Sequence, residues 1–434
     1  MTTAVVGAGL SGLVQARVLA ARGEDVVLFE SSNRAGGVVR SEEVDGYLLE
    51  LGPNTVRPTT ELWALVEELG LESETLLADP RTPRYIDFGG RLHPLPMSPR
   101  ELIRTRLLSL SGKLRLLAEP FVPKGDPSGE TVRAFFTRRV GPEVADRLVE
   151  PFVSGIWGGR SDRLSVEQAF PSLARWEVEG GSLTRGAFAA LRGRAKAPRM
   201  GKPGLLSFRS GLETLPRRLA EGLGTRVRFG ARVESLRRSG QGWKISLPAE
   251  DVEVDRLCLA APALEAARLV ETVAPEAAAA LSAMPQPPLV VVHLSAPGGV
   301  RHDGFGHLVA PQPGRRILGA IWSSSLFAGR APADRALYTV FLGGARDPGA
   351  IGLADEEVVE IASRDLSAAL ETGERFDPVR ITRYSRAIPQ YDLEHRRRLE
   401  ALSRAEERLP GLSFLGSYRG GIAVGDVVRS ALTI

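Results

Sequence analysis

The chain has 434 residues, 43% of them hydrophobic and 25% charged, so it carries enough apolar material for more than one core. Its 56 basic and 52 acidic side chains leave a net charge of +4, and the basic residues are scattered, which argues against a nucleic-acid-binding protein. The single cysteine, Cys258, excludes a disulfide framework and a cysteine-rich metal site, and we expect it to be inert core. No stretch has the length and apolarity of a spanning helix and the N-terminus lacks a signal peptide, so we expect a cytoplasmic protein whose membrane contact is peripheral.

The first 30 residues carry the most informative pattern. Residues 2–6 predict a strand, residues 13–20 predict a helix, and residues 26–29 predict a second buried strand that ends at Glu30. A Gly-x-Gly-x-x-Gly turn joins the first strand to the helix, and its residues are Gly7, Ala8, Gly9, Leu10, Ser11 and Gly12. In such units the glycines permit a tight turn, backbone contact with a pyrophosphate and close helix packing, while the acid binds a ribose. The pattern therefore predicts a dinucleotide site.

The residues after Glu30 favour FAD over NAD. Ser31 and Arg34 lead into the glycine pair Gly36–Gly37 and Val38, and a later turn contains Gly52, Pro53, Asn54 and Thr55. This continuation resembles the extended fingerprint of the FAD-dependent amine-oxidase and phytoene-desaturase superfamily. The resemblance implies that the glycine pair lies against the flavin diphosphate and that the later turn passes near the isoalloxazine. Because the sequence has one such glycine motif, we expect non-covalent FAD that an organic substrate reduces and O2 reoxidises, without a second nucleotide site.

Later motifs resemble a narrower family. Residues 84–96 predict a hairpin with a Gly-Gly turn, and GFGHLV (304–309), IPQY (388–391) and GSYRGGIAVGD (416–426) follow in order. Together they resemble the oxygen-dependent protoporphyrinogen oxidase family, which includes a branch that oxidises coproporphyrinogen. Two positions depart from the family pattern: Gly425 stands where Asn is usual, and Tyr384 stands where some members have Trp.

The resemblance implies an α/β fold in three parts. A Rossmann-type FAD-binding domain would combine residues 1–82, 205–265 and 385–434, and an α/β substrate-binding domain would combine 83–94 and 266–384. Residues 95–204 would form an inserted helical domain that associates with membranes. Within residues 99–120, apolar side chains alternate with basic ones, as is typical of a helix on an anionic membrane surface; the alternative is a helix packed on its own protein. We therefore expect peripheral attachment to the inner face of the cell membrane.

The resemblance also implies residues for substrate and cofactor. Arg84 would anchor a propionate of a porphyrinogen, because a guanidinium pairs well with a carboxylate. The macrocycle would lie between the apolar side chains of Leu308, Leu318 and Phe341, with the backbone of Gly155 close by. The remaining FAD contacts would come from Val233, Tyr384, Val424, Gly425 and Asp426.

The reaction expected from this family is oxidation of protoporphyrinogen IX to protoporphyrin IX in haem biosynthesis. Six electrons would pass in three cycles through the flavin to O2, giving H2O2. Aromatisation supplies the driving force, so we assign no catalytic acid or base. The five histidines are dispersed without ligand spacing, so we predict no metal. The expected partners are the porphyrinogen, O2 and an anionic membrane surface, with no nucleic acid; a homodimer and hand-off to the next haem enzyme stay open.

Three alternatives differ from this interpretation. Flavin amine oxidases hold a water at the flavin through a Lys, but the matching stretch, residues 287–296, has none. A flavin-free binding protein on the same scaffold, as in the Rab GDP-dissociation inhibitors, would be colourless. Coproporphyrinogen III as substrate stays open, because its two extra propionates would need cations, for which Arg301, Arg315 and Arg330 are candidates.

Overall fold

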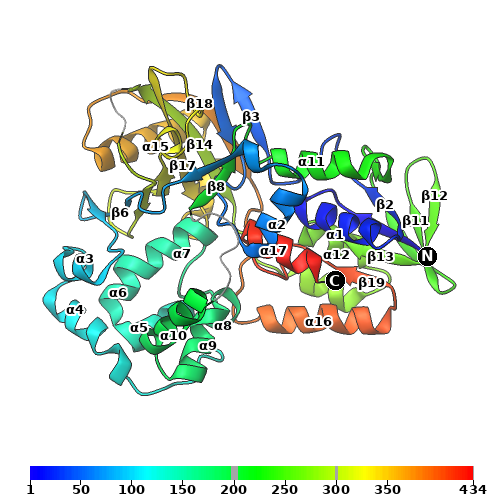
Figure 1. The fold of residues 1–434 in the computed structure, drawn as a ribbon, viewed down its shortest axis with the longest axis horizontal. Helices are drawn as coiled ribbons and strands as arrows, with labels where there is room; N and C mark the ends of the chain where they lie inside the picture. The colour runs from blue at the N-terminus through cyan, green and yellow to red at the C-terminus, as the bar shows by residue number, and fades with distance from the viewer. Residues whose placement is uncertain (197–203, 299–301, 434) are drawn as a thin grey trace.

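Two β-sheets organise the structure, a computed structural model that describes residues 1–196, 204–298 and 302–433 (Figure 1). One is a five-stranded sheet in the order β19-β13-β1-β2-β9, and the other a seven-stranded sheet in the order β18-β14-β17-β16-β15-β6-β7. Figure 1 shows the five-stranded sheet with its helices on one side of the molecule, and the seven-stranded sheet and a helical region on the other. The candidate functional sites lie where these parts meet.

The five-stranded sheet is parallel throughout and buried on both faces. Its strands are β1 (Thr2–Val6), β2 (Asp25–Phe29), β9 (Val227–Arg228), β13 (Arg256–Leu259) and β19 (Leu412–Phe414). Val5 of β1 faces the helices α1 (Leu10–Ala21), α2 (Thr60–Glu68), α11 (Thr214–Leu223) and α17 (Val424–Leu432). Ala4 and Val6 face the opposite layer, made of α12 (Ala263–Val270), α13 (Pro275–Ser282), α16 (His395–Arg408) and the antiparallel strands β10 (Ser235–Ser239), β11 (Gly242–Ser246) and β12 (Asp251–Val254). Burial on both faces explains why these strands are apolar without alternation.

The seven-stranded sheet is antiparallel except for one pair. Its strands are β6 (Arg84–Phe88), β7 (Arg91–Pro94), β14 (Leu289–Pro297), β15 (Gly306–Val309), β16 (Ile317–Ile321), β17 (Arg335–Gly343) and β18 (Asp377–Tyr384). The parallel pair is β6 with β15, which sets Arg84 beside Gly306. Helix α15 (Asp355–Leu370) covers one face, and its Val358 and Leu366 pack with Val340. The other face is left to the rest of the molecule.

The described residues from 95 to 196 form helices. They are α3 (Pro99–Arg104), α4 (Leu110–Leu117), α5 (Val132–Val140), α6 (Pro142–Val144), α7 (Glu150–Trp157), α8 (Val166–Ala169), α9 (Pro171–Gly180) and α10 (Leu183–Lys196), with a π-helical turn at Ala145–Val149. A buried ion cluster holds them together, because Arg139 pairs with both Glu119 and Glu177 and all three side chains are almost inaccessible to solvent. Helix α7 reaches the free face of the seven-stranded sheet. Two short antiparallel strand pairs complete the fold. β3 (Ser41–Val44) pairs with β4 (Tyr47–Glu50), and β5 (Thr75–Ala78) pairs with β8 (Leu205–Phe208).

The predicted β1–α1–β2 unit and the β6–β7 hairpin are confirmed. Val233 lies between β9 and β10 and belongs to neither strand. The amphipathic stretch 99–120 forms two short helices, since the chain between α3 and α4 turns inward and buries Leu107 and Leu108. Cys258 is buried in β13, and burial raises the pKa of its thiol to about 12, as expected for an inert core cysteine.

Candidate functional site

The glycine turn after β1 has the geometry that a pyrophosphate needs. Gly7 has φ +107°, and a Cβ there would lie 2.9 Å from the Ala260 carbonyl oxygen. A Cβ on Gly12 would overlap the Gly7 carbonyl oxygen, whereas one on Gly9 would meet nothing within 4 Å. Gly9 is also the N-cap of α1, whose first turn has no capping side chain and no acidic residue. The free N–H groups and the positive end of the helix dipole therefore face open space beside Gly9, where an anion would bind.

Glu30 directly follows β2, and its side chain contacts this turn. One carboxylate oxygen accepts a hydrogen bond from the Ala8 N–H at 2.8 Å, and the other accepts one from the Ser32 N–H at 2.8 Å. Ser31 is exposed beside it, with its hydroxyl 3.4 Å from the carboxylate. The carboxylate is thus fixed by backbone donors next to the phosphate-type site, where it can accept hydrogen bonds from ribose hydroxyls.

The second glycine pair packs directly on the first turn. The Gly36 N–H donates to the Ala8 carbonyl at 2.8 Å, and a Cβ on Gly37 would lie 3.2 Å from the Gly9 Cα. Arg34 holds the pair in place by donating to the Gly37 carbonyl. Val38 follows and is 67% exposed, which is unusual for a valine in a well-packed region. The pair predicted to border the flavin diphosphate therefore borders the open space at Gly9.

The turn at Gly52–Thr55 continues the same line of backbone contacts. A Cβ on Gly52 would overlap the Val38 carbonyl oxygen, so the two turns touch backbone to backbone. The Tyr384 hydroxyl donates to the Leu51 carbonyl at 2.7 Å, and burial raises the pKa of this tyrosine. Tyr384, where some family members have Trp, is thus tied to the turn through its hydroxyl. Pro53 and Thr55 lie half-buried in the same turn.

The C-terminal motif completes the group. Helix α17 begins at Val424, and a Cβ on Gly425 would lie 2.6 Å from the Thr59 Cγ2 and 3.3 Å from the Arg57 carbonyl oxygen. This close approach explains why Gly replaces the usual Asn here. Asp426 is half-buried, which raises the pKa of its carboxyl. Val424 lines a small apolar pocket together with Leu10, Val39, Val56, Leu206 and Leu215.

Among the residues predicted to contact the cofactor, Val233 has the position that suits this role least. Its side chain is 4% exposed and packs in the core beneath the parallel sheet, and its carbonyl accepts a hydrogen bond from Arg268 at 3.0 Å. A nucleotide base could therefore reach the backbone N–H of Val233 but neither its side chain nor a free carbonyl. The assignment of adenine contact to this residue stays a prediction.

The five predicted substrate residues lie together. Arg84, Leu308, Leu318 and Phe341 sit on the neighbouring strands β6, β15, β16 and β17. Leu308 and Phe341 are both paired with Gly319, and Leu318 occupies an irregularity next to it, so these side chains gather at one place on the sheet. A Cβ on Gly155 of α7 would overlap Leu308 Cδ2, so α7 packs on this face through its glycine.

Arg84 is a cation without an anionic partner. Among the described residues no carboxylate pairs with its half-buried guanidinium, whose one recorded contact is the Phe305 ring, 5.4 Å away at the centroid. Burial and the charge of Arg57 both lower the pKa of Arg84. Arg57 is exposed and likewise unpaired within the described residues. Arg315 and Arg330 are by contrast committed, to Asp87 at 2.8 Å and to Glu50 at 3.3 Å; Arg301 lies outside the described residues.

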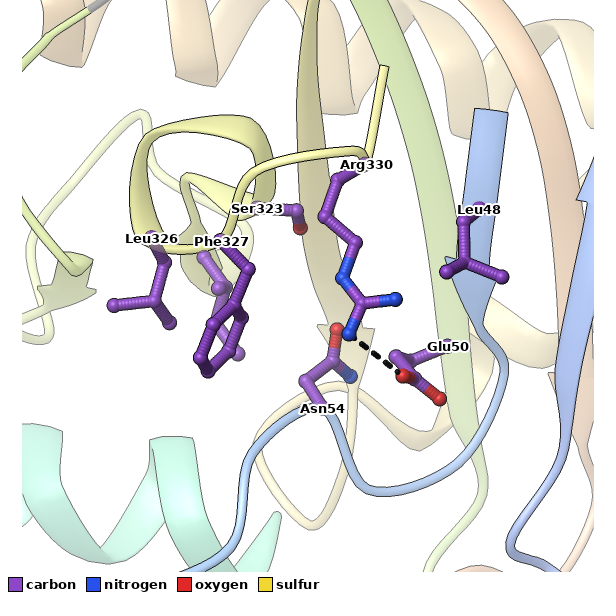
Figure 2. Close-up of a pocket in the computed structure, with 8 residues that line it drawn as sticks. Leu48, Glu50, Asn54, Ser323, Leu326, Phe327 and Arg330 are labelled. Carbon is purple, nitrogen blue, oxygen red and sulfur yellow. Dashed lines mark ion pairs between the residues drawn. The ribbon is translucent and has the colours of Figure 1, made fainter. Parts of the chain in front are cut away.

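A buried pocket beside Asn54 was not found by sequence reasoning (Figure 2). Figure 2 shows Arg330 descending toward Glu50, with which it forms an ion pair. Burial raises the pKa of the Glu50 carboxyl to about 7, although Arg330, Ser41 and the Leu212 N–H act in the opposite direction. Neither Glu50, at the end of β4, nor Arg330, in a loop, belongs to a sequence motif. The full lining is Leu48, Glu50, Asn54, Ile321, Ser323, Leu326, Phe327 and Arg330.

The IPQY motif has a structural role that its sequence could not show. Gln390 donates to the Trp157 carbonyl at 2.7 Å, at the end of α7. Tyr391 stacks edge-on against the Trp157 ring, donates to the Ser417 carbonyl at 2.5 Å and accepts from the Gly421 N–H at 3.0 Å. The motif therefore joins the helical region to the C-terminal segment that precedes α17.

The described ranges contain neither a metal-type cluster nor a helix that could span a membrane. No cluster of three or more His, Cys, Asp or Glu side chains in residues 1–196, 204–298 and 302–433 could hold a metal ion. In the same ranges no helix has both the length and the apolarity needed to cross a membrane.

Comparison with known proteins identifies the scaffold. Residues 10–434 match the family of flavin-containing amine oxidoreductases. The chain is 32% identical to the chloroplastic protoporphyrinogen oxidase of Nicotiana tabacum, covering 99% of this chain and 84% of that one, and 34% identical to the protoporphyrinogen oxidase of Bos taurus, covering 99% and 96%. A crystal structure of a candidate protoporphyrinogen oxidase from Exiguobacterium superposes with a TM-score of 0.82 at 22% identity, covering 100% of this chain and 97% of that one. A putrescine oxidase superposes with a TM-score of 0.70 at 18% identity, covering 100% and 98%.

These matches establish FAD as the cofactor and remove the flavin-free binding protein from the alternatives. The residues of the glycine turns fit this group: an uncapped helix N-terminus, an open face at Gly9 and a carboxylate at the end of β2 lie together. Gly7, Gly9, Gly12, Glu30, Gly36 and Gly37 are therefore the residues that would hold its diphosphate and ribose.

The contrast between two glycines tests this assignment. Gly9 has an extended backbone with φ −67°, and its Cβ direction is empty, so Gly9→Val should fold normally and lose FAD because the side chain fills the pyrophosphate position. Gly12→Ala is the matched control, in which the added methyl overlaps the Gly7 carbonyl and should lower the melting temperature of the apoprotein. FAD released by heat and measured by chromatography, beside apoprotein melting curves, separates the two. Parental FAD content in Gly9→Val would contradict the site.

The pH dependence of stability tests the burial of Glu50. Its pKa is raised from 4.5 to about 7, so the stability it contributes is complete below about pH 4.5 and is lost as the pH rises through about 7. The unfolding free energy of the parent minus that of Glu50→Gln should therefore fall by about 1–3 kcal/mol between pH 5 and pH 8. Urea unfolding at several pH values measures it, with the exposed Glu253→Gln as control. A difference that does not change with pH would show that Glu50 does not titrate in this range.

Proposed function

Because this chain belongs to the protoporphyrinogen oxidase family of flavin-containing amine oxidoreductases, we propose that it oxidises protoporphyrinogen IX to protoporphyrin IX. Bound FAD supplies the acceptor for the two electrons of each cycle, and O2 takes them on as H2O2. Three cycles remove the six electrons that separate the porphyrinogen from the aromatic porphyrin.

The single observation that carries this proposal is the unpaired cation at the apolar end of the seven-stranded sheet. Arg84 is half-buried without a carboxylate, beside a second unpaired arginine that repels it, and only an anion relieves that arrangement. The apolar residues Leu308, Leu318 and Phe341 lie on the neighbouring strands. An anion attached to a large apolar macrocycle is the ligand that fits both, and a porphyrinogen with its propionates has this form.

The residues then act by positioning. Arg84 binds a propionate through its planar fork, and Arg57 adds positive charge from the side of the Gly52–Thr55 turn. Leu308, Leu318 and Phe341 hold the macrocycle, and the absence of a side chain on Gly155 lets the backbone of α7 approach Leu308 closely. Water is excluded by the packing of α7 on the sheet, which keeps the reacting carbon oriented while it loses hydride.

The charges favour protoporphyrinogen over coproporphyrinogen III as the substrate. The second substrate carries two more propionates and would need further free cations. Arg315 and Arg330 are each paired with a buried carboxylate, so neither offers a fully free guanidinium to a further propionate. Arg57 and Arg84 suffice for a dicarboxylate.

Strand β14 gives no support to the amine oxidase alternative. β14 contains no lysine, and its one titratable side chain, His293, is fully buried, which lowers its pKa to about 4. A side chain held neutral in the core cannot take the place of a water-binding ammonium.

We further propose that α3 and α4 attach the protein peripherally to anionic membranes. Both lie at the edge of the molecule far from the parallel sheet (Figure 1). Their apolar side chains are unusually exposed: Ile103 70%, Leu110 74%, Leu114 60%, Leu117 62% and, just beyond, Phe121 85%. Exposed Arg100, Arg104 and Arg106 lie in the same segment without an ion-pair partner in the described residues. Apolar side chains beside free cations fit the interface of an anionic bilayer.

Location at the inner face of the cell membrane, a homodimer and hand-off of the product remain predictions.

Arg84→Ala should lower kcat/KM for protoporphyrinogen roughly ten- to hundredfold, through loss of a charge-assisted contact of about 1.5–3 kcal/mol. Arg84→Lys should recover part of the loss, because an ammonium keeps the charge without the fork. Arg91→Ala, an exposed arginine on the neighbouring strand β7, serves as control and should match the parent. Porphyrin fluorescence gives the rates, and FAD content and melting temperature should not change. Parental kcat/KM in Arg84→Ala would remove this residue from the substrate site.

Replacing Arg100, Arg104 and Arg106 together with Gln should weaken binding to anionic vesicles about tenfold or more at low salt, since each basic residue near such a surface contributes about 1 kcal/mol. The difference should shrink at high salt. Lys113 and Arg115 are left intact because they cap the carbonyl ends of α3 and α5. Replacing Arg397, Arg404 and Arg408 of α16 removes the same charge from the opposite side of the molecule and should have no effect. Equal sedimentation of both triple variants would refute this attachment site.

A further inference from the structure

The pocket beside Asn54 has no part in the reaction described so far. It lies between the Gly52–Thr55 turn and the seven-stranded sheet, next to the short helix α14 (Ser323–Leu326) (Figure 2). Half of its lining is apolar, from Leu48, Ile321, Leu326 and Phe327. The other half is polar or charged, from Glu50, Asn54, Ser323 and Arg330.

The pocket also contains a buried cation with an unused donor. Arg330 is 2% exposed; it donates to the Ser207 hydroxyl at 2.5 Å and to the Phe208 carbonyl at 3.3 Å, and pairs with Glu50. Its second terminal nitrogen, Nη1, has no hydrogen-bond acceptor and no access to solvent. A guanidinium N–H left without an acceptor in a buried site is costly, so it marks a position where an acceptor belongs.

A chain of backbone contacts connects the pocket to the glycine turns that would hold the cofactor. The backbone contacts run from Gly9 to Gly37, from Val38 to Gly52, and then through the turn to Asn54, which lines the pocket. A cofactor whose diphosphate lies at Gly9 and extends past the exposed Val38 leads in this direction. The pocket thus lies beside the path of the cofactor and across the turn from its diphosphate end.

We propose that this pocket admits dioxygen and that Arg330 stabilises the negative charge that develops on it during reoxidation of the flavin. The reduced flavin would give two electrons and its N5 proton, and water would give the second proton and become hydroxide. Dioxygen then leaves as hydrogen peroxide, so atoms and electrons balance. The apolar walls bring dioxygen in, and the unused N–H meets the charge as it forms. The proposal rests on the proposed function only in that both use a reduced flavin.

Burial of Glu50 supports the same role. Since the pKa of Glu50 is raised to about 7, its carboxylate neutralises Arg330 only in part near neutral pH. The pocket therefore keeps net positive character although it contains an acid.

The test uses holoenzyme whose flavin is reduced by light without oxygen, so that no porphyrinogen is needed, and then mixed with oxygenated buffer. The double variant Arg330→Met with Glu50→Gln removes both charges together, which avoids leaving one buried charge unpaired. Leu326→Trp fills the pocket without changing a charge, and Arg330→Lys keeps the charge. The matched control is Arg315→Met with Asp87→Asn, a second pair with a buried carboxylate, in which Asp87 belongs to β6 and Arg315 precedes β16.

The double variant and Leu326→Trp should each lower the second-order rate constant for reoxidation at least tenfold, Arg330→Lys should lie between, and the control should match the parent. In crystals of the parent under xenon pressure, xenon should occupy the pocket, and in Leu326→Trp it should not. Parental reoxidation in the double variant, or a pocket that takes bromide but no xenon, would overturn the proposal. Anaerobic flavin reduction by protoporphyrinogen, measured separately, reports on the proposed function alone.

Discussion

Backbone-to-backbone contact between successive turns is the constraint on which the cofactor site depends. Gly12 packs on the carbonyl of Gly7, Gly37 packs on Gly9, and Gly52 packs on the carbonyl of Val38. At each contact a methyl group would overlap or crowd main-chain atoms, so a side chain would push the turns apart. Three segments distant in sequence are thereby held within one strip of main chain, with its donors directed at the open space beside Gly9. At the C-terminal end, a Cβ on Gly425 would lie 2.6 Å from the Thr59 side chain and 3.3 Å from the Arg57 carbonyl oxygen.

The second constraint concerns charge. The described part of the chain is rich in arginine–carboxylate pairs, including the buried cluster around Arg139 that holds the helical region together. Against this background the unpaired Arg84 and Arg57 stand out, because a half-buried guanidinium without a partner carries a desolvation cost that only a ligand removes. The arginines thus have two roles: those paired with carboxylates stabilise the fold, and the unpaired ones remain available to an anion. Arg330 falls between the two classes, since one side of its guanidinium is paired and the other has an unused donor.

The sequence alone predicted those parts of the molecule that depend on local pattern. The β1–α1–β2 unit follows from alternation of apolar runs with glycine, and the β6–β7 hairpin follows from Gly89–Gly90 between two short apolar runs. The family resemblance also gathered Arg84, Leu308 and Phe341, although strand register brings them together only in three dimensions. The pairing of Glu50 with Arg330 could not be predicted, because it depends on long-range packing of a hairpin against a loop 280 residues away.

The central claim is that a porphyrinogen dicarboxylate is the electron donor to this flavin. The most direct measurement mixes the FAD-loaded protein without oxygen with protoporphyrinogen IX, coproporphyrinogen III or a primary amine, and follows flavin absorbance together with porphyrin fluorescence. The account predicts that protoporphyrinogen bleaches the flavin fastest with matching porphyrin formation, that coproporphyrinogen reacts more slowly, and that the amine leaves the flavin oxidised. Rapid bleaching by the amine, with the flavin unchanged by either porphyrinogen, would contradict it.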